Sequence, residues 1–276
     1  MTVSDTLRRA FLRETFERFH HPEYISPDPL EFVYLYEDPL DREIVGLIAS
    51  ALAYGRVAQV LKSVGGVLGK MGPFPRAFLE DTQEVDLRER FRGFRHRFTT
   101  EWELADLIRG IQGVLRRHGS LQACFLSGLR PGDDTVGPAL CAFVRELNVH
   151  ENSGGYNSLI PVPDKNSACK RLHLFLRWMV RSDAVDPGVW RDVPPEKLIV
   201  PLDTHMFRTC RSLGMTTRSQ ADGKTALEIT SAFRKIEPGD PVKYDFSLTR
   251  IGIRREGDLS RLIESCARTS VMRGWT

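Results

Sequence analysis

The sequence has few cysteines, and their arrangement fits neither a metal site nor a disulfide framework. Only five are spread over the 276 residues, and no two are close together. There is no Cys-x-x-Cys pair, no zinc pattern and no four-cysteine run for an iron–sulfur cluster. Reduced thiols are typical of an intracellular protein. We therefore expect no metal and no other cofactor.

Long hydrophobic runs are also absent. No stretch reaches the length that spans a membrane, and the first twenty residues, MTVSDTLRRAFLRETFERFH, lack the apolar segment of a secretory signal. With 41% hydrophobic and 27% charged residues, the composition is that of a soluble globular protein. The net charge of +3 gives only weak support for a nucleic-acid partner. The expectation is a cytoplasmic protein without membrane contact.

Strand-like sequence is scarce. Only EKLIVP (196–201) reads as a strand, whereas 57–71 has its apolar residues at the 3.6-residue period of a helix. The stretch DREIVGLIASALAYG (41–55) is apolar nearly all round and predicts a central buried helix. Further helices are predicted at 5–20, 101–118, 120–128, 138–149, 167–181, 203–213, 222–236 and 240–251. The predicted fold class is all-α.

Internal repeats and long linkers are absent as well. The Pro- and Gly-rich joints between predicted helices are short, so residues 1–276 are expected to form one compact unit with two helical lobes. Residues 41–149 would make one lobe. Residues 1–40 and 215–276 would complete the second, with the N-terminal helices packing against the C-terminal ones. Residues 150–214 carry the segments with chemical potential.

One of these segments lacks acidic residues altogether. SACKRLHLFLRWMVR (167–181) has Ser167 as a good N-cap and keeps its cations off the apolar face, at Lys170, Arg171, Arg177 and Arg181. A capped helix N-terminus with a cationic flank suits a phosphate group. The alternative is a solvated basic face on an ordinary helix.

The segment IVPLDTHMFRTCRSLG (199–214) places a carboxylate, a hydroxyl and an imidazole at the start of a predicted helix. At the N-cap, the Asp203 carboxylate can accept backbone amides, and the helix dipole favours its ionised form. Taken alone, Asp203 indicates no more than helix capping, and His205 no more than a packed or solvated residue.

The whole segment nevertheless resembles the stretch that carries the catalytic aspartate in the helix-hairpin-helix DNA glycosylases, the HhH-GPD superfamily, where the pattern is close to V-D-T-H-x-x-R-x-x-x-R-L-G. The matching residues are Pro201, Asp203, Thr204, His205, Arg208, Arg211, Leu213 and Gly214. Lys170 is similar in position to the lysine of the lyase-type members, and LIP (159–161) to the Leu-Pro pair before their hairpin turn. The motifs cover roughly residues 150–255. The chain is most similar to a divergent bacterial family of unknown function within or beside that superfamily.

The sequence departs from the superfamily at the hairpin. The usual turn reads G-x-G, whereas PDKNSA (163–168) has no glycine. Asn166 tolerates a left-handed backbone and Ser167 can cap, so backbone amides can still face a phosphate. The sequence between Lys170 and Asp203 is longer than in the common branches, through DAVDPGVWRDVPPEKL (183–198), as in a divergent archaeal 8-oxoguanine branch.

The resemblance implies a two-lobed, glycosylase-like all-α fold with a divergent helix-hairpin-helix, acting on damaged double-stranded DNA as a monomer in the nucleoid-containing cytoplasm. A target base must leave the stack to be reached. Lys170 would attack the sugar C1′ and form a Schiff base, and Asp203 would stabilise the sugar cation. An oxidised purine is the first candidate base, and an AP-lyase step stays open. The implied DNA contacts are Asn166, Ser167, Arg171 and Arg208.

Two other segments are candidates for DNA contact. LRERFRGFRHRF (87–98) interleaves arginine with phenylalanine, which suits a nucleic-acid backbone and unstacked bases, or else an arginine-coated helix or turn whose phenylalanines fill the core. By position, the end of the buried helix resembles the helix end that lines the base pocket in the glycosylases. The resemblance implies a pocket formed by Tyr54, Arg56 and Gln59 together with His205, with an ordinary rim aromatic as the alternative for Tyr54. Asp245, in the last predicted helix, is assigned to packing.

The sequence leaves the function open between three classes. The first is a DNA glycosylase that uses Lys170 and Asp203. The second is a protein of the same fold that binds nucleic acid without catalysis, which the missing hairpin glycines favour. The third is an α-helical protein unrelated to nucleic acid, for which DNA binding would be absent or insensitive to salt.

Overall fold

The computed structural model describes residues 4–148, 157–163 and 166–253, and within them the chain is mostly helical, which confirms the all-α prediction. The α-helices are α1 (Asp5–Phe19), α2 (Pro39–Ala51), α3 (Val57–Met71), α4 (Pro75–Asp81), α5 (Leu87–Arg90), α6 (Glu101–His118), α7 (Leu121–Ser127), α8 (Gly137–Leu147), α9 (Lys170–Val180), α10 (Thr204–Ser212), α11 (Gly223–Arg234) and α12 (Asp245–Ile253). The 3-10 helices are η1 (Pro22–Tyr24), η2 (Pro29–Leu35), η3 (Glu84–Asp86) and η6 (Pro195–Lys197). One short hairpin pairs β1 (Arg95–His96) with β2 (Thr99–Thr100).

Local capping chemistry sets several helix ends. The capping box at the start of α6 joins Thr100 to Glu103, and Gly119, with φ 80°, ends the helix in the left-handed conformation. At the start of α1 the Ser4 side chain accepts from the amide of Leu7. The helices predicted at 57–71 and 101–118 therefore have the expected bounds.

The central helix is α2, as its apolar sequence predicts. Residues 43–51 are all buried, and the helix packs against α9, α4, α7 and η2. α6, α7 and α8 pack against one another, and Gly110 permits their closeness because a Cβ there would collide with the carbonyl oxygen of Leu147. η2 contacts α2 and α3, so residues 29–35 lie with the helices of the 41–149 segment rather than with α1.

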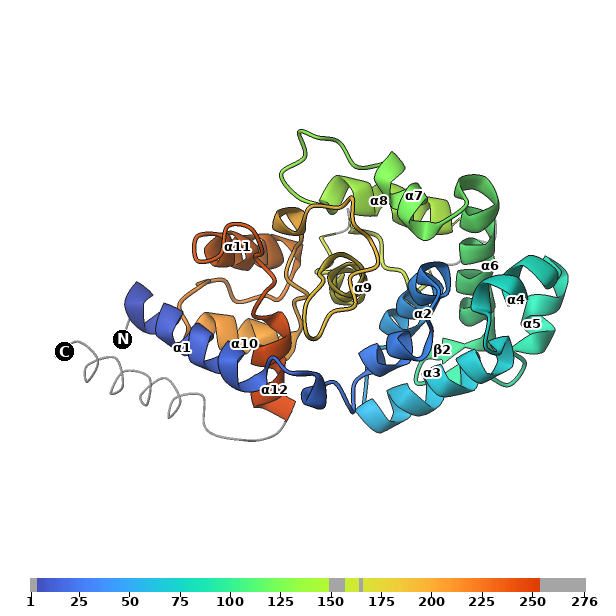
Figure 1. The fold of residues 1–276 in the computed structure, drawn as a ribbon, viewed down its shortest axis with the longest axis horizontal. Helices are drawn as coiled ribbons and strands as arrows, with labels where there is room; N and C mark the ends of the chain where they lie inside the picture. The colour runs from blue at the N-terminus through green and yellow to red at the C-terminus, as the bar shows by residue number, and fades with distance from the viewer. Residues whose placement is uncertain (1–3, 149–156, 164–165, 254–276) are drawn as a thin grey trace.

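A second group of helices forms where the two ends of the described chain meet. α1 packs against α12, and α12 against α10, so N-terminal and C-terminal helices lie together as expected. α9 lies between α2 on one side and α10 and α12 on the other (Figure 1). Helix α9 is one link between the two groups, through Asp203 and Asp245, and the pair of Arg250 with Asp28 is another. None of the described helices combines the length and the apolar character needed to cross a bilayer.

Two expectations about local structure are wrong. EKLIVP forms no strand: residues 195–197 are a 3-10 helix, and the next three are extended but unpaired. The helix predicted from residue 167 begins at Lys170, because Cys169, not Ser167, is the N-cap. The 87–98 segment, which the sequence left open between a nucleic-acid surface and an arginine-coated helix or turn, contains a one-turn helix and the first strand of a hairpin.

Candidate functional site

Lys170 and Asp203 stand at the N-termini of two neighbouring helices. The amino group of Lys170, the first residue of α9, lies 3.3 Å from Oδ2 of Asp203. The other carboxylate oxygen of Asp203 accepts the amide of Met206 at 2.8 Å and so caps α10. The two side chains are 33% and 31% exposed. The expected convergence of these two side chains is confirmed as geometry.

Lys170 does not stabilise α9 at the position it occupies. The dipole makes the N-terminus of a helix partly positive, and a cation in the first turn is therefore unfavourable. Cys169 precedes it in a left-handed conformation with φ 42°, which few residues with a side chain adopt. The carboxylate of Asp203 supplies the charge that offsets the dipole. The two helix starts thus hold an amine and a carboxylate together.

The pair faces an open cleft of about 780 Å³. Its walls come from the end of α2, the segment before α9, and the starts of α9, α10 and α11. Charged groups of both signs line it, and among them are Lys170, Arg171, Asp203 and Asp222. A cleft with this mixture suits a polar ligand larger than a water cluster.

Arg171 and Tyr54 form one wall of the cleft. The Arg171 guanidinium donates to the carbonyl oxygens of Ala51, at 2.5 Å, and of Ser158. It also lies 4.9 Å from the centre of the Tyr54 ring. The Tyr54 hydroxyl donates to the carbonyl of His96 at 2.8 Å and lies 2.6 Å from Oγ1 of Thr99. Both side chains are therefore held in place, and the Tyr54 ring is a fixed wall.

His205 also lines the cleft, as the second residue of α10. Its Nε2 lies 3.3 Å from the carbonyl oxygen of Leu248 in α12. The remaining base-pocket candidates, Arg56 and Gln59, are exposed and lie outside this cleft. Gln59 instead lines a smaller groove beside α3, and Arg56 is the N-cap residue of α3. Arg208 is exposed on α10, also outside the cleft walls. Of the four pocket candidates, the cleft gathers two.

The turn that precedes α9 is tied to α11. Asn166 has the left-handed conformation that its sequence suggested, with φ 56°. Its side chain donates to Asp222 at 3.2 Å and accepts the amide of Lys224 at 3.3 Å. The Ser167 hydroxyl accepts the amide of Cys169 at 3.2 Å. The side chains expected to face a phosphate are thus used within the protein; Asp164 and Lys165, in the same turn, lie outside the described residues.

Asp222 is the cleft residue that the sequence analysis missed. It caps α11 through the amide of Thr225, and that bond, with those from Asn166 and Arg218, lowers the pKa of Asp222 to about 2 in spite of desolvation. It is therefore ionised at any physiological pH. The only sequence signal was an aspartate before a predicted helix, which by itself indicates a cap.

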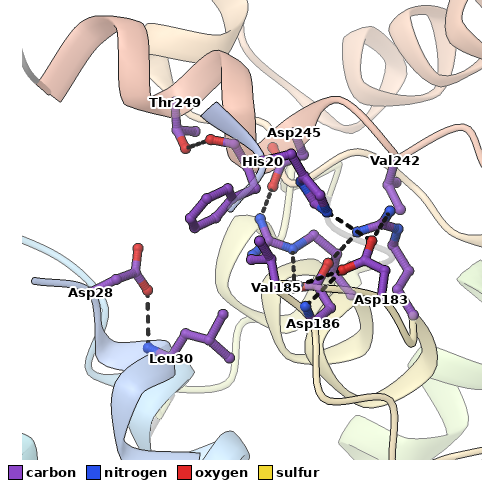
Figure 2. Close-up of polar contacts among 12 residues, drawn as sticks. His20, Asp28, Leu30, Asp183, Val185, Asp186, Val242, Asp245 and Thr249 are labelled. Atoms are coloured by element: carbon purple, nitrogen blue, oxygen red, sulfur yellow. Dashed lines mark hydrogen bonds and ion pairs between the residues drawn. The ribbon is translucent and has the colours of Figure 1, made fainter. Parts of the chain in front are cut away.

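A buried ion network around the C-terminal half of α9 fixes the orientation of this helix (Figure 2). Arg177 pairs with Asp186, at 3.1 Å, and with Asp245, and all three side chains are buried. Arg181 pairs with Asp186, with Asp183 at 2.7 Å and with Asp240 at 2.9 Å. Figure 2 shows His20 beside Asp183, and their closest atoms are 2.9 Å apart. The network joins α9 to α1 and α12.

This network corrects one expectation. Arg177 and Arg181 form neither a phosphate-binding flank nor a solvated basic face, because their guanidinium groups are buried among carboxylates. Burial raises the pKa of Asp183, but the hydrogen bond from His20 and the charge of Arg181 outweigh it, and the net pKa lies well below its usual range. Asp245 packs as expected, in its pair with Arg177.

No group of three or more His, Cys, Asp or Glu side chains in the described part of the chain is arranged to hold a metal ion. Residues 28–254 match the model of a family described as a protein of unknown function, DUF2400. Comparisons with curated proteins and with solved structures give no match.

Proposed function

The chain belongs to the DUF2400 family, and we propose that it is a DNA glycosylase that removes a damaged base with Lys170 and Asp203. The resemblance of residues 199–214 to the helix-hairpin-helix glycosylases suggests the reaction. One geometric observation carries the proposal: the Lys170 amine lies 3.3 Å from the Asp203 carboxylate at the floor of a cleft able to admit a nucleoside. A lysine at a helix N-terminus does not stabilise the helix, whereas an amine next to a carboxylate is suited to a reaction at one sugar.

The proposed chemistry begins with a proton transfer. Lys170 must lose a proton before it can attack, and Asp203 is the nearest carboxylate to accept it. The amine then bonds to the sugar C1′ and the bond from C1′ to the base nitrogen breaks. The base leaves with the bonding electrons and takes up the proton that Asp203 had accepted, which returns Asp203 to its ionised form. One of the two protons on the nitrogen then moves to the ring oxygen O4′ as the bond from C1′ to O4′ breaks, and this gives the protonated Schiff base. The carboxylate stabilises the positive charge that develops on the sugar.

The second candidate function is nucleic-acid binding without catalysis. The observation that favours it is the use of Asn166 and Ser167 within the protein, together with the ionised Asp222 beside them. A carboxylate at the turn repels a phosphate, so this turn does not hold the backbone phosphate that would position a sugar for cleavage, and a bound strand would be held by other parts of the surface. In this alternative the cleft holds an extruded base without cutting the glycosidic bond.

Borohydride trapping tests the proposal. The purified protein is incubated with duplexes that carry one oxidised, alkylated or deaminated base or an abasic site, and borohydride reduces any Schiff base to a stable adduct. Lys170→Gln should abolish the adduct while the protein stays folded, because an amide cannot form a Schiff base. Lys235→Gln, which removes an exposed lysine from the other end of α11, is the matched control and should trap as the parent does.

Each outcome decides between the candidates. An adduct lost only in Lys170→Gln supports the lyase-type enzyme. Base release without an adduct that still requires Asp203 supports a glycosylase without a lyase step. Tight binding to the same duplexes without an adduct and without base release supports the binding protein. If the protein forms no adduct, releases no base and does not bind, DNA is not its partner.

A further inference from the structure

The β1–β2 hairpin projects an aromatic side chain beside the cleft. Its register, Arg95 opposite Thr100 and His96 opposite Thr99, leaves only Arg97 and Phe98 in the turn. Phe98 is 81% exposed. Burying a phenylalanine elsewhere would stabilise the fold by about 2 kcal/mol, so its exposure is not explained by stability. This tip belongs to the segment 87–98, whose alternating arginine and phenylalanine the cleft does not use.

The hairpin is fixed to the core on both strands. His96 is buried, with Nδ1 2.9 Å from the Ser63 hydroxyl and Nε2 3.0 Å from the carbonyl of Tyr54. Thr99 is also buried and lies next to the Tyr54 hydroxyl. Arg97 has φ 54°, a left-handed conformation that costs on the order of 1 kcal/mol for a residue with a side chain. A strained turn held by buried anchors is rigid, so Phe98 is presented in one place.

The tip adjoins the cleft through Arg97. The Arg97 side chain passes against Gly55, a cleft residue, so closely that a Cβ at Gly55 would meet its Cδ at 2.7 Å. The Arg97 guanidinium lies 5.6 Å from the centre of the Phe98 ring and 5.9 Å from that of Tyr54. Because Arg171 lies on Tyr54 as well, a ladder of alternating rings and guanidiniums runs from Phe98 to the wall of the cleft.

A cationic groove continues from the other side of the hairpin. It has a volume of about 310 Å³ and lies between α3 and residues 91–95. Lys62, Lys70, Arg92 and Arg95 line it, and no aspartate or glutamate does. Arg92 pairs with Glu89 at the surface and Lys70 donates to the carbonyl of Arg90. Lys62 and Arg95 have no ion-pair partner among the residues that the structure describes.

Exposed aromatics combined with unneutralised cations are the features that bind single-stranded nucleic acid, where bases stack on rings and phosphates meet cations. We propose that the hairpin tip and the groove bind the strand that leaves the cleft, with Phe98 stacked on an unpaired base and Lys62 and Arg95 against the phosphates that follow. The inference rests on the proposed nucleic-acid partner and adds where the strand runs and what holds it. It does not depend on whether the cleft performs catalysis.

The test uses two fluorescein-labelled probes, a 12-nucleotide single strand and a duplex with an abasic-site analogue, and measures affinity by fluorescence anisotropy at several salt concentrations. Phe98→Ala should weaken binding about five- to a hundredfold, the range for loss of one base–aromatic stack. The salt dependence of its DNA affinity and its melting temperature should equal those of the unchanged protein, because the side chain is exposed and contacts no phosphate. Phe98→Trp should restore binding. Phe74→Ala is the matched control, since Phe74 is 66% exposed at the start of α4.

The groove has a different signature. Lys62→Gln combined with Arg95→Gln should reduce the slope of log affinity against log salt by about 1.5, since each lost phosphate contact removes 0.7 to 0.9. Arg191→Gln, on the exposed loop beside α7, should leave the slope unchanged. If the parent binds the probes and Phe98→Ala binds them like Phe74→Ala, the inference is wrong while the proposed function stands.

Two further outcomes are decisive. Weaker binding in Phe98→Ala together with no base release or trapping by the parent supports the strand path and rejects the glycosylase. Failure of the parent to bind either probe rejects both, and binding to vesicles of anionic phospholipid in its place would assign the exposed Phe98 and the cations to a membrane surface.

Discussion

At the scale of single residues, Asp203 has two roles that substitution can separate. It caps α10 by accepting the amide of Met206, and it faces Lys170 with its other oxygen. Asparagine caps nearly as well as aspartate but carries no charge. Asp203→Asn should therefore keep the parent's melting temperature while base release falls by on the order of a hundredfold, the scale for one preorganised electrostatic group.

The matched variant for this prediction is Asp203→Ala, which loses both roles. It should lose about 1 kcal/mol of stability, as expected for a missing N-cap, as well as activity. Melting curves and single-turnover base release on the substrate found by trapping give the two readouts. Full activity in Asp203→Asn would reduce Asp203 to a helix cap and would remove the glycosylase proposal.

His173 predicts how stability depends on pH. It lies one turn after Lys170 on α9, and its burial lowers its pKa to about 4. An unfolded histidine has a pKa of about 6.5, so the unfolded state takes up a proton first as the pH falls. The contribution of His173 is therefore fully present above pH 6.5 and is lost between about 6.5 and 4. From pH 7.5 to 5.0 the loss should be about 2 kcal/mol.

Urea unfolding at pH 7.5 and 5.0 measures this loss. His173→Leu removes the titration, so its free energy of unfolding should fall by about 2 kcal/mol less than that of the parent over this interval. His21→Leu, at an exposed position, should fall as much as the parent. Equal losses in the parent and in His173→Leu would mean that the ring is protonated in the folded state.

At the scale of elements, one substitution in α3 should raise stability and at the same time weaken DNA binding. Gly66 and Gly69 lie on its exposed face, and a Cβ at either would meet nothing within 4 Å. Alanine at either position should stabilise the helix by about 1 kcal/mol. Only Gly66 lines the groove between α3 and residues 91–95. Gly66→Ala should therefore raise the melting temperature and weaken DNA binding several-fold, whereas Gly69→Ala should only raise the melting temperature.

Elements were predictable where periodicity and caps agree. The helix at 57–71, the α6 cap at Gly119 and the Asp203 cap of α10 follow from local sequence. The convergence of Lys170 and Asp203 followed from the motif resemblance rather than from periodicity. The start of α9 was misplaced because Cys169 adopts a left-handed cap, for which a buried cysteine gives no signal. The hairpin was missed because its two-residue turn holds no glycine or asparagine, the residues that usually mark one.

Contacts between segments that are distant in the sequence could not be predicted from the sequence. The sequence predicted that the cations of 167–181 form a solvated or phosphate-binding face, because this stretch contains no aspartate or glutamate. Their partners come from the loop after α9 and from the start of α12, and only the folded chain brings these together. The same limit applies to Arg56 and Gln59, which follow Tyr54 closely in sequence but lie outside the cleft because the chain turns at Gly55, with φ 98°.

At the scale of the whole molecule, Arg177 is the joint between α9 and the elements packed against it. Its guanidinium sits between the buried carboxylates of Asp186 and Asp245. Arg177→Leu would leave Asp245 buried without its cation and Asp186 with Arg181 as its remaining partner, and removal of one partner from a buried ion pair costs about 3 to 5 kcal/mol. Arg92→Leu, which breaks the exposed pair with Glu89, should cost less than about 1 kcal/mol.

The deficit of Arg177→Leu should shrink as the pH falls. Burial raises the pKa of Asp245 and the charge of Arg177 opposes that rise, so without Arg177 the folded state takes up a proton on Asp245 before the unfolded state does, and acid relieves the penalty. In the parent, Asp183 has the opposite sign: its folded pKa is depressed, so its contribution is lost as acid protonates it. Urea unfolding of parent and variant at pH 7.5 and 4.5 should therefore show a smaller difference at the lower pH. A difference that stays constant would mean that water reaches Asp186 and Asp245 in the variant, and that the buried network does not hold α9 against α12.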